Sequence, residues 1–189
     1  CVDILVAFDL NAATWAKTNG GGVTNFAQTA VQKMNVALAN TGLDSSFRFR
    51  LVGVATLSVS ASTVHDGMEA IKDNRTGWYE VKTARDAVGA DIVTTLVDTG
   101  SAYGINGVGK ALDSGMSPSS FAENAYNVCA IRAVAISHTM THEVGHNMGA
   151  GHSDVQVSQP GPQLYPYSSG YYFIANDEPC CTIIAYNGE

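Results

Sequence analysis

Three histidines and one glutamate lie within the short segment His142–His152. His142 and His146 are four residues apart, so on a helix both imidazoles project from one face and can reach a single ion. Glu143 follows the first of these histidines and can point into the same site without binding the metal. The pattern predicts a metal centre held by histidine nitrogens, with a carboxylate beside it that acts as a general base.

His152 can join this centre only if the chain leaves the helix after His146. On a continued helix it would lie about 9 Å along the axis from His146 and about 240° around it. Gly149 stands where a left-handed residue would end the helix and turn the chain back. Three neutral imidazoles and one open position are typical of catalytic zinc, whereas four protein ligands close a structural site. We therefore predict one catalytic zinc ion bound by His142, His146 and His152.

The positions of the chain's histidines in the sequence support this site. Four of the five histidines lie between His138 and His152, a clustering that scattered structural histidines would not show. The alternative is that they are ordinary surface or core histidines on an unremarkable helix. His138 lies one turn before His142 and is interpreted as a residue at the start of the helix or one that supports a ligand. His65 is interpreted as an ordinary surface histidine.

Alternating strands and helices must position these residues. A glycine-rich stretch, 103–112, is expected to form an edge strand that another backbone can approach closely. The order of elements predicts an α/β fold, in which helices pack on a mostly parallel, twisted sheet. The expected strands are 2–8, 47–59, 90–97 and 126–131, and the expected helices are 23–39, 66–72, 78–88 and 133–148.

Length and composition limit the classes of function. The 189 residues suit a single domain, and we expect 1–152 to form an upper α/β subdomain and 153–189 an irregular lower one. The formal net charge of −7 disfavours nucleic acid and anionic membranes as partners, because both attract a basic surface. No apolar run approaches the roughly 20 residues of a membrane span. We expect a monomer.

The four cysteines are compatible with disulfides. Cys180 and Cys181 are neighbours and rarely bond to each other, because a disulfide normally places its Cα atoms about 4.4 to 6.8 Å apart. A bridge from Cys129 to one of this pair is the first expectation, and a bridge from Cys1 to the other is the second. Free buried thiols are the alternative.

Taken together, these segments resemble the metzincin clan of zinc endopeptidases, whose pattern is H-E-x-x-H-x-x-G-x-x-H followed by a turn beneath the metal. Segment 139–149 (TMTHEVGHNMG) is similar to the active helix of the adamalysin, or reprolysin, group. Segments 165–171 (YPYSSGY) and 182–186 (TIIAY) are similar to bacterial peptidyl-Asp metalloendopeptidases. The resemblance implies a twisted five-stranded mixed sheet with long helices, an active-site helix and an irregular C-terminal subdomain. It also implies a secreted endopeptidase that acts on polypeptides.

The resemblance also assigns roles near the metal. Ile184 occupies the place of the turn methionine, and Ser153 follows the third ligand, as in matrixins. Tyr186 matches a tyrosine that can ligate zinc or stabilise the oxyanion; a buried tyrosine with a structural hydrogen bond is the alternative. The segment 103–109 is expected to bind the substrate backbone as an added antiparallel strand, through four residues, with a loose loop as its alternative. These four residues are Tyr103, Gly104, Ile105 and Gly107.

Calcium is a second metal that the resemblance implies. Asp3 and Asp98 match acidic positions on the first strand and after the third strand that bind calcium in adamalysin-like proteins. Solvated carboxylates are the alternative interpretation of both residues. The C-terminal residues that complete such a site in the family would follow Glu189.

Charge argues for a substrate preference that differs from that of the peptidyl-Asp group, which cuts before acidic residues. Residues 133–189 contain no lysine or arginine, and a buried acidic side chain without a partner costs several kcal/mol. We predict apolar or aromatic residues after the cut, and Arg132 is the one group that could restore an acidic preference. The expected pocket walls are Tyr165, Tyr167, Tyr171 and Tyr172.

Two other functions stay open on the sequence alone. One is a non-catalytic binding module that keeps the fold as a recognition scaffold. Such a module should lose Glu143 or a histidine first, and all four residues are present. The other is a zinc hydrolase that acts on something other than a peptide, which extended strands beside a metal cleft disfavour.

Overall fold

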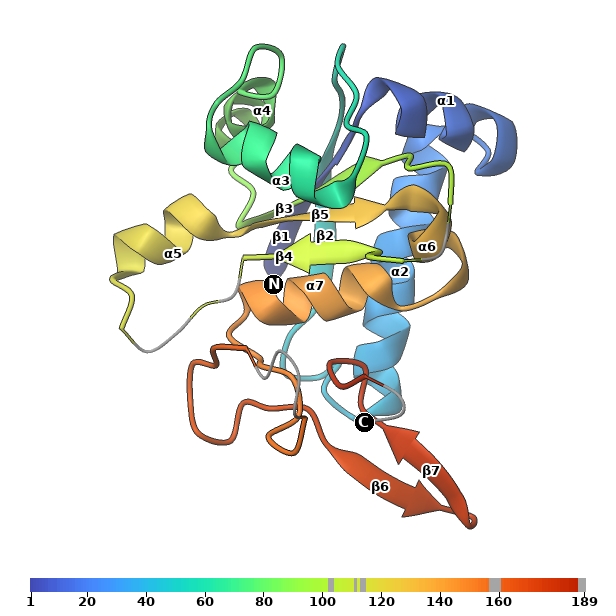
Figure 1. Ribbon diagram of the computed structural model, residues 1–189, viewed down its shortest axis with the longest axis vertical. Helices are drawn as coiled ribbons and strands as arrows, with labels where there is room; N and C mark the ends of the chain where they lie inside the picture. Colours follow the sequence, from blue (N-terminus) through green and yellow to red (C-terminus); the bar gives the residue numbers. More distant parts are fainter. Residues whose placement is uncertain (102–103, 111, 113–114, 157–160, 187–189) are drawn as a thin grey trace.

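The computed structural model describes residues 1–101, 104–110, 112, 115–156 and 161–186 (Figure 1). The strands are β1 (Val2–Phe8), β2 (Phe49–Thr56), β3 (Ile92–Val97), β4 (Gly107–Gly109), β5 (Tyr126–Ala130), β6 (Tyr172–Ala175) and β7 (Glu178–Cys181). The helices are α1 (Leu10–Asn19), α2 (Val23–Asn40), α3 (Val64–Lys72), α4 (Glu80–Val88), α5 (Pro118–Asn124), α6 (Ile131–Ile136) and α7 (Thr139–Asn147).

Five strands form one mixed sheet in the order β2-β1-β3-β5-β4. Neighbouring strands run parallel except β4, which pairs with β5 in the antiparallel direction at the edge of the sheet. Strand β1 is buried on both faces, as a parallel sheet covered by helices requires. Ile4, Val6 and Phe8 enter one hydrophobic cluster, and Leu5 and Ala7 enter the other. The predicted α/β fold with a five-stranded mixed sheet is confirmed.

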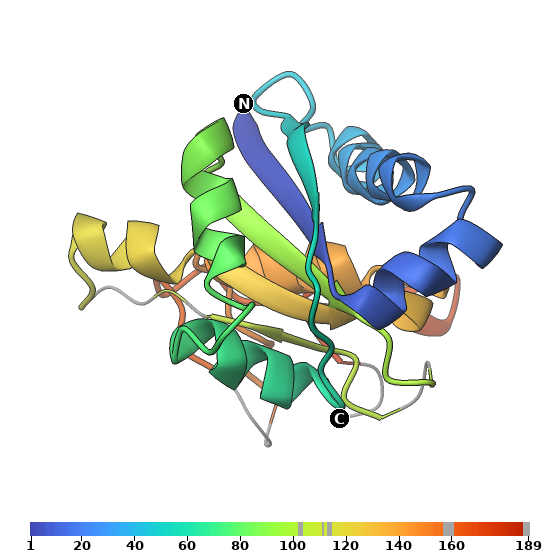
Figure 2. The same ribbon diagram turned by 90° about the horizontal axis from the view of Figure 1, so that it is seen from above.

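Helices cover both faces of this sheet (Figure 2). The apolar stripe of α2, including Phe26, Ala30 and Met34, packs in the first cluster together with Met140 and Val144 of α7. Helices α3 and α4 pack in the second cluster on the opposite face through Met68, Val81 and their neighbours. Among the described residues, none of the helices combines the length and apolar character needed to cross a bilayer.

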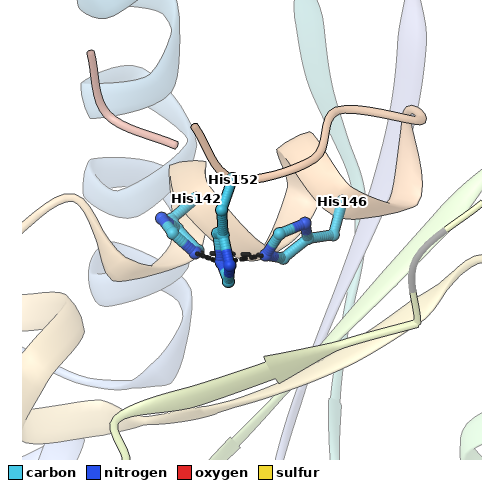
Figure 3. Close-up of side chains that lie close together, drawn as sticks. All are labelled: His142, His146 and His152. Atoms are coloured by element: carbon cyan, nitrogen blue, oxygen red, sulfur yellow. Dashed lines mark hydrogen bonds between the residues drawn. The ribbon is translucent and has the colours of Figure 1, made fainter. Parts of the chain in front are cut away.

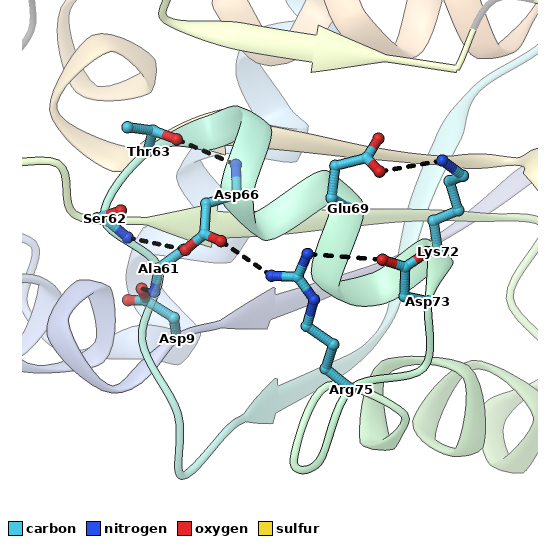
Figure 4. Close-up of polar contacts among 9 residues, drawn as sticks. All are labelled: Asp9, Ala61, Ser62, Thr63, Asp66, Glu69, Lys72, Asp73 and Arg75. Atoms are coloured by element: carbon cyan, nitrogen blue, oxygen red, sulfur yellow. Dashed lines mark hydrogen bonds and ion pairs between the residues drawn. The ribbon is translucent and has the colours of Figure 1, made fainter.

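Helix α1 was not predicted, and a buried aspartate explains its start. Asp9 is fully buried, and its Oδ1 accepts a hydrogen bond from the Ala12 N–H at 2.6 Å, which caps the helix. Its Oδ2 accepts from the Ala61 N–H at 3.0 Å, so the same side chain fixes the loop before α3 (Figure 4). Thr63 then caps α3 through the Asp66 N–H at 3.0 Å.

The single helix predicted over 133–148 is wrong, because the chain is broken between α6 and α7. Ser137 takes an extended conformation (φ −138°, ψ −177°), which ends α6 and lets α7 begin at Thr139. The ammonium group of Lys33, on α2, donates to the carbonyl oxygens of Val134 at 2.8 Å and Ser137 at 2.9 Å. These long-range bonds satisfy carbonyls that the broken helix leaves without partners.

The segment after His152 is mostly irregular, as expected, but it also contains an antiparallel hairpin of β6 and β7. Asn176 and Asp177 have φ of 53° and 64°, the left-handed conformation found in tight hairpin turns. The expected disulfides are absent, since all four cysteines are free. Cys129 is fully buried in the sheet, and its Sγ lies 3.5 Å from Asn127 Oδ1.

Candidate metal and catalytic site

Helix α7 presents the first two histidines to a common point. Both His142 and His146 are largely buried, and their Nε2 atoms lie 3.1 Å apart. His142 Nδ1 lies 2.8 Å from the Ile183 carbonyl oxygen, and His146 Nδ1 lies 2.8 Å from the Ala150 carbonyl oxygen. A carbonyl oxygen only accepts, so each Nδ1 carries the proton and each Nε2 keeps its lone pair for a metal.

The third histidine reaches the same point through a turn at Gly149. This residue has a φ of 90°, and its N–H donates to the His146 carbonyl at 3.0 Å, which ends the helix. A β-carbon at Gly149 would lie 2.5 Å from Leu164 Cβ, so both conformation and space require glycine there. His152 then places its Nε2 3.2 Å from that of His142 and 3.0 Å from that of His146. Helix α7 thus ends at Asn147, and Gly149 follows it in the left-handed conformation.

The three nitrogens fit one zinc ion (Figure 3). Three ligands about 2.0–2.1 Å from one tetrahedral ion lie about 3.3–3.4 Å from each other. The Nε2 separations of 3.0 to 3.2 Å are close to that value. Among the described residues, these three histidines are the one group of His, Cys, Asp and Glu side chains placed to hold a metal together.

The surroundings keep two of these imidazoles ready to bind. Burial, together with the neighbouring His142, lowers the pKa of His146 to about 4. Burial also lowers the pKa of His142, although its hydrogen bond to the Ile183 carbonyl acts in the opposite direction. Metal binding requires the neutral imidazole, so both residues are in the binding form near neutral pH.

Glu143 lies beside the histidines and is not one of the clustered ligands. Its side chain is buried, and burial raises the pKa of this carboxyl group to about 8. A hydrogen bond from the backbone N–H of Gly109 acts in the opposite direction. A cation held by the triad would favour the charged carboxylate further, so the group is suited to exchange protons near neutral pH.

The turn 182–186 lies against the histidines. The Tyr186 ring stacks on His142, with centroids 5.5 Å apart, and its centroid lies 4.4 Å from that of His152. It is 41% exposed, so the alternative of a buried structural tyrosine is wrong. Ile184 packs under α7, where its Cδ1 would lie only 3.0 Å from a β-carbon at Gly145. The structure therefore brings Ile184 and Tyr186 to the predicted site.

A cleft of about 710 Å³ runs past the triad and is lined by β4, α7 and the turn. Three of the expected substrate-binding residues, Gly104, Ile105 and Gly107, line it, and Tyr103 lies outside the described residues. His138 begins α7 as expected. His65 is exposed, as expected for a surface residue, and it lines the cleft together with the other four histidines.

The tyrosines assigned to a specificity pocket lie away from the lining of this cleft. None of these four residues is among the described residues that line the cleft, and three of them are more than half exposed. Arg132 lies outside the lining as well. Its guanidinium binds Asp98 through bonds of 2.7 and 3.1 Å. The tyrosines in question are Tyr165, Tyr167, Tyr171 and Tyr172.

The structure does not bring Asp3 and Asp98 together, so the expected calcium site is not formed by these two residues. Asp3 lies at the start of β1, whereas Asp98 follows the far end of the parallel strand β3. Each carboxylate is held by an arginine instead. Arg50 binds Asp3 at 2.7 Å and lowers the pKa of that carboxyl group, and Arg132 does the same for Asp98.

Two contributions to the site were not predicted. Gly109 lies against Glu143, and the repeat of glycine at positions 107 and 109 is a signal that both residues share one face of a strand. Asn147 ties the end of α7 to the sheet. Its Nδ2 donates to the carbonyls of Lys110 and Tyr126, both at 3.0 Å, and its Oδ1 accepts from Asn127 at 2.8 Å. No local pattern indicates these long-range partners.

Comparisons with known proteins bear on the fold and on the family. A chain in a solved structure described as "Structure of a chaperone-substrate complex" matches 100% of this chain with a TM-score of 0.62 and 21% identity, which bears on the fold alone. This chain spans 28% of the length of that one. No curated protein matched. The reprolysin-type model of metallo-peptidase family M12 matches residues 1–187. The chain therefore belongs to metallo-peptidase family M12.

Proposed function

We propose that this chain is a zinc-dependent endopeptidase in which Glu143 serves as the general base and then the general acid. The observation that supports this most strongly is the convergence of three Nε2 atoms, each 3.0 to 3.2 Å from the others, beside a buried carboxylate. His142, His146 and His152 would hold the ion. Zinc, when bound, supplies a Lewis acid for the attacking water and the scissile carbonyl.

The chain's own residues account for the proton transfers. An oxygen of the Glu143 carboxylate takes a proton from the attacking water, and the same oxygen returns it to the leaving amine nitrogen. The raised pKa, near 8, matches a group that must both accept and donate at neutral pH. Burial among α7 and β4 limits competing water around the carboxylate. Tyr186, whose ring lies against two of the histidines, is placed to donate its hydroxyl proton toward the developing oxyanion.

The substrate class in this proposal is an extended polypeptide. In the described part of the chain, β4 pairs with β5 on one side only, so its other edge offers backbone groups beside the cleft. A peptide can add there as an antiparallel strand, which holds the scissile bond without requiring a particular sequence. The proposal includes action outside the cell as a monomer, which is supported by the family resemblance alone.

The test is digestion of a random peptide library by the purified, zinc-loaded protein, followed by sequencing of the new ends. We expect internal cleavage that a chelator abolishes and that added zinc restores. Absence of any new termini from the zinc-loaded protein, with zinc bound at one ion per chain, would favour a non-catalytic binding module. Cleavage confined to terminal residues would contradict the assignment of an endopeptidase.

A further inference from the structure

Strand β4 presents glycine to the active helix at two successive positions of one face. Gly107 and Gly109 point toward α7, because side chains alternate along a strand and both sites face Glu143. Val108, between them, points away and packs against the hydrophobic cluster on the α3 side of the sheet. Neither glycine has a positive φ, so backbone conformation does not require glycine at either position. The requirement is one of space.

The space nearest to Gly107 is taken by the side chain of Glu143. A β-carbon there would lie 2.6 Å from Glu143 Cγ and 2.7 Å from Cδ, and closer still to Oε1. Its three nearest neighbours are therefore all atoms of one carboxyl-bearing side chain, and no ligand or backbone atom is among them. A methyl group at this position must move the carboxyl group, and it can do so without moving α7.

The space at Gly109 is taken by the helix itself. A β-carbon there would lie 2.7 Å from the Glu143 carbonyl oxygen and 3.1 Å from His146 Cβ, besides 2.9 Å from Glu143 Oε2. The Gly109 N–H also hydrogen-bonds Glu143. Backbone atoms cannot rotate out of the way as a side chain can. A methyl group at this position must therefore shift α7 and, with it, the ligand His146.

We propose that Gly107 and Gly109 are positioning residues with separate tasks. Gly107 sets the place of the Glu143 carboxylate, and Gly109 sets the distance between the ligand-bearing helix α7 and the sheet. The expected effect of these glycines on peptide hydrolysis rests on the proposed function. Their expected effect on zinc affinity does not depend on it. Substrate pairing along the edge of β4 uses backbone groups in the plane of the sheet, so it gives no reason for glycine on the face toward α7.

The experiment compares Gly107→Ala, Gly109→Ala and the control Gly53→Ala, which adds a methyl group to β2 at the opposite edge of the sheet. A β-carbon at Gly53 meets only side-chain methyls of Leu5 and Val88, at 3.0 to 3.3 Å, so kcat and zinc affinity should stay within about 2-fold. Gly107→Ala should lower kcat about 100-fold with KM and zinc affinity unchanged. Gly109→Ala should weaken zinc at least about 10-fold in chelator competition and lower kcat as well.

A compensating substitution separates positioning from general destabilisation. Glu143→Asp shortens the side chain by one methylene and withdraws the carboxyl group from Gly107. In the Glu143→Asp background, Gly107→Ala should therefore cost less than about 3-fold in kcat, against about 100-fold in the parent. Gly107→Ala and this double variant decide the proposal even if Gly109→Ala does not fold.

Three results would overturn the proposal. One is a Gly107→Ala variant as active as the parent, and another is the same cost of Gly107→Ala in both Glu143 backgrounds. The third is equal loss of zinc by the two β4 variants. If the zinc-loaded parent cleaves nothing, the proposed function fails, but the order of zinc affinities among the three variants still tests the positioning roles. If the parent cleaves and only the expected order fails, the proposed function stands.

Discussion

Single residues determine the apolar packing beneath the metal site. Ile184 stands where the resembling families carry methionine, and its side chain fills the space under Gly145, between the two helical ligands. Neither residue type binds the metal, so the exchange alters only apolar packing. The neighbouring Ile183 orients His142, because its backbone carbonyl oxygen lies 2.8 Å from His142 Nδ1. This contact does not involve the side chain at position 184.

We expect Ile184→Met to be tolerated. The change conserves apolar volume, so the free energy of unfolding should shift by less than about 1.5 kcal/mol, and zinc binding and activity should survive. Urea denaturation of the two proteins, with zinc analysis by atomic absorption, measures this. A parent protein that holds no zinc, beside a methionine variant that does, would support the binding-module alternative.

Tyr186 offers a second prediction at this scale. If its hydroxyl group donates to the oxyanion, Tyr186→Phe keeps the ring against His142 and His152 but removes the donor. We expect kcat to fall about 10- to 100-fold, with KM and zinc affinity close to those of the parent. Steady-state kinetics on one fluorogenic peptide would measure kcat and KM separately. An unchanged kcat would show that the hydroxyl group takes no part in the mechanism.

At the scale of elements, the end of α6 depends on a residue more than a hundred positions away. The Lys33 ammonium bonds the carbonyls of Val134 and Ser137 and is partly buried, which lowers its pKa. Replacing it by methionine keeps the stem and removes the donor. We expect Lys33→Met to lower the free energy of unfolding by about 1–3 kcal/mol in urea denaturation.

The matched control for this variant is Lys17→Met. Lys17 is exposed in the last turn of α1, and the change should alter the stability by less than about 0.5 kcal/mol. Equal effects of the two substitutions would mean that the Lys33 bonds do not support the break between α6 and α7.

Elements with a regular apolar pattern could be predicted from the sequence, and those fixed by distant partners could not. The stripe from Phe26 to Met34 indicated α2 within a residue of its bounds. The fully buried residues of helix α1 are all alanines, and the helix depends on the Asp9 cap, so its periodic signal is weak. The break at Ser137 depends on its extended backbone and on Lys33 from another helix, neither of which local periodicity records.

Across the whole molecule, some residues of the site could be predicted from local sequence, and others are placed by distant parts of the chain. The ligand set could be predicted because all three histidines and the turn between them lie in one short segment. The carbonyl that orients His142 and the glycines that contact Glu143 come from 34 to 41 residues away, through the sheet and the final turn. Their positions follow from the tertiary fold, so the sequence alone could not supply them.

The charge of the cleft leads to a prediction about substrates. No lysine or arginine is among the described residues that line it, and Arg132 is held by Asp98. At pH 8, where imidazoles carry little charge, a buried acidic side chain after the cut would lack a cationic partner. Profiling should therefore show few Asp or Glu residues there, and Arg132→Ala should leave the profile unchanged. A clear majority of acidic residues would refute this.

In the proposed mechanism, a metal held by the histidines works together with Glu143 to hydrolyse peptides. The most direct measurement compares the rate of peptide cleavage and the zinc content of the parent, Glu143→Ala and His146→Ala. Glu143→Ala should keep one zinc per chain yet lose several orders of magnitude in kcat, whereas His146→Ala should lose the zinc as well. A zinc-loaded Glu143→Ala protein that cleaves at the parental rate would rule out Glu143 as the general base.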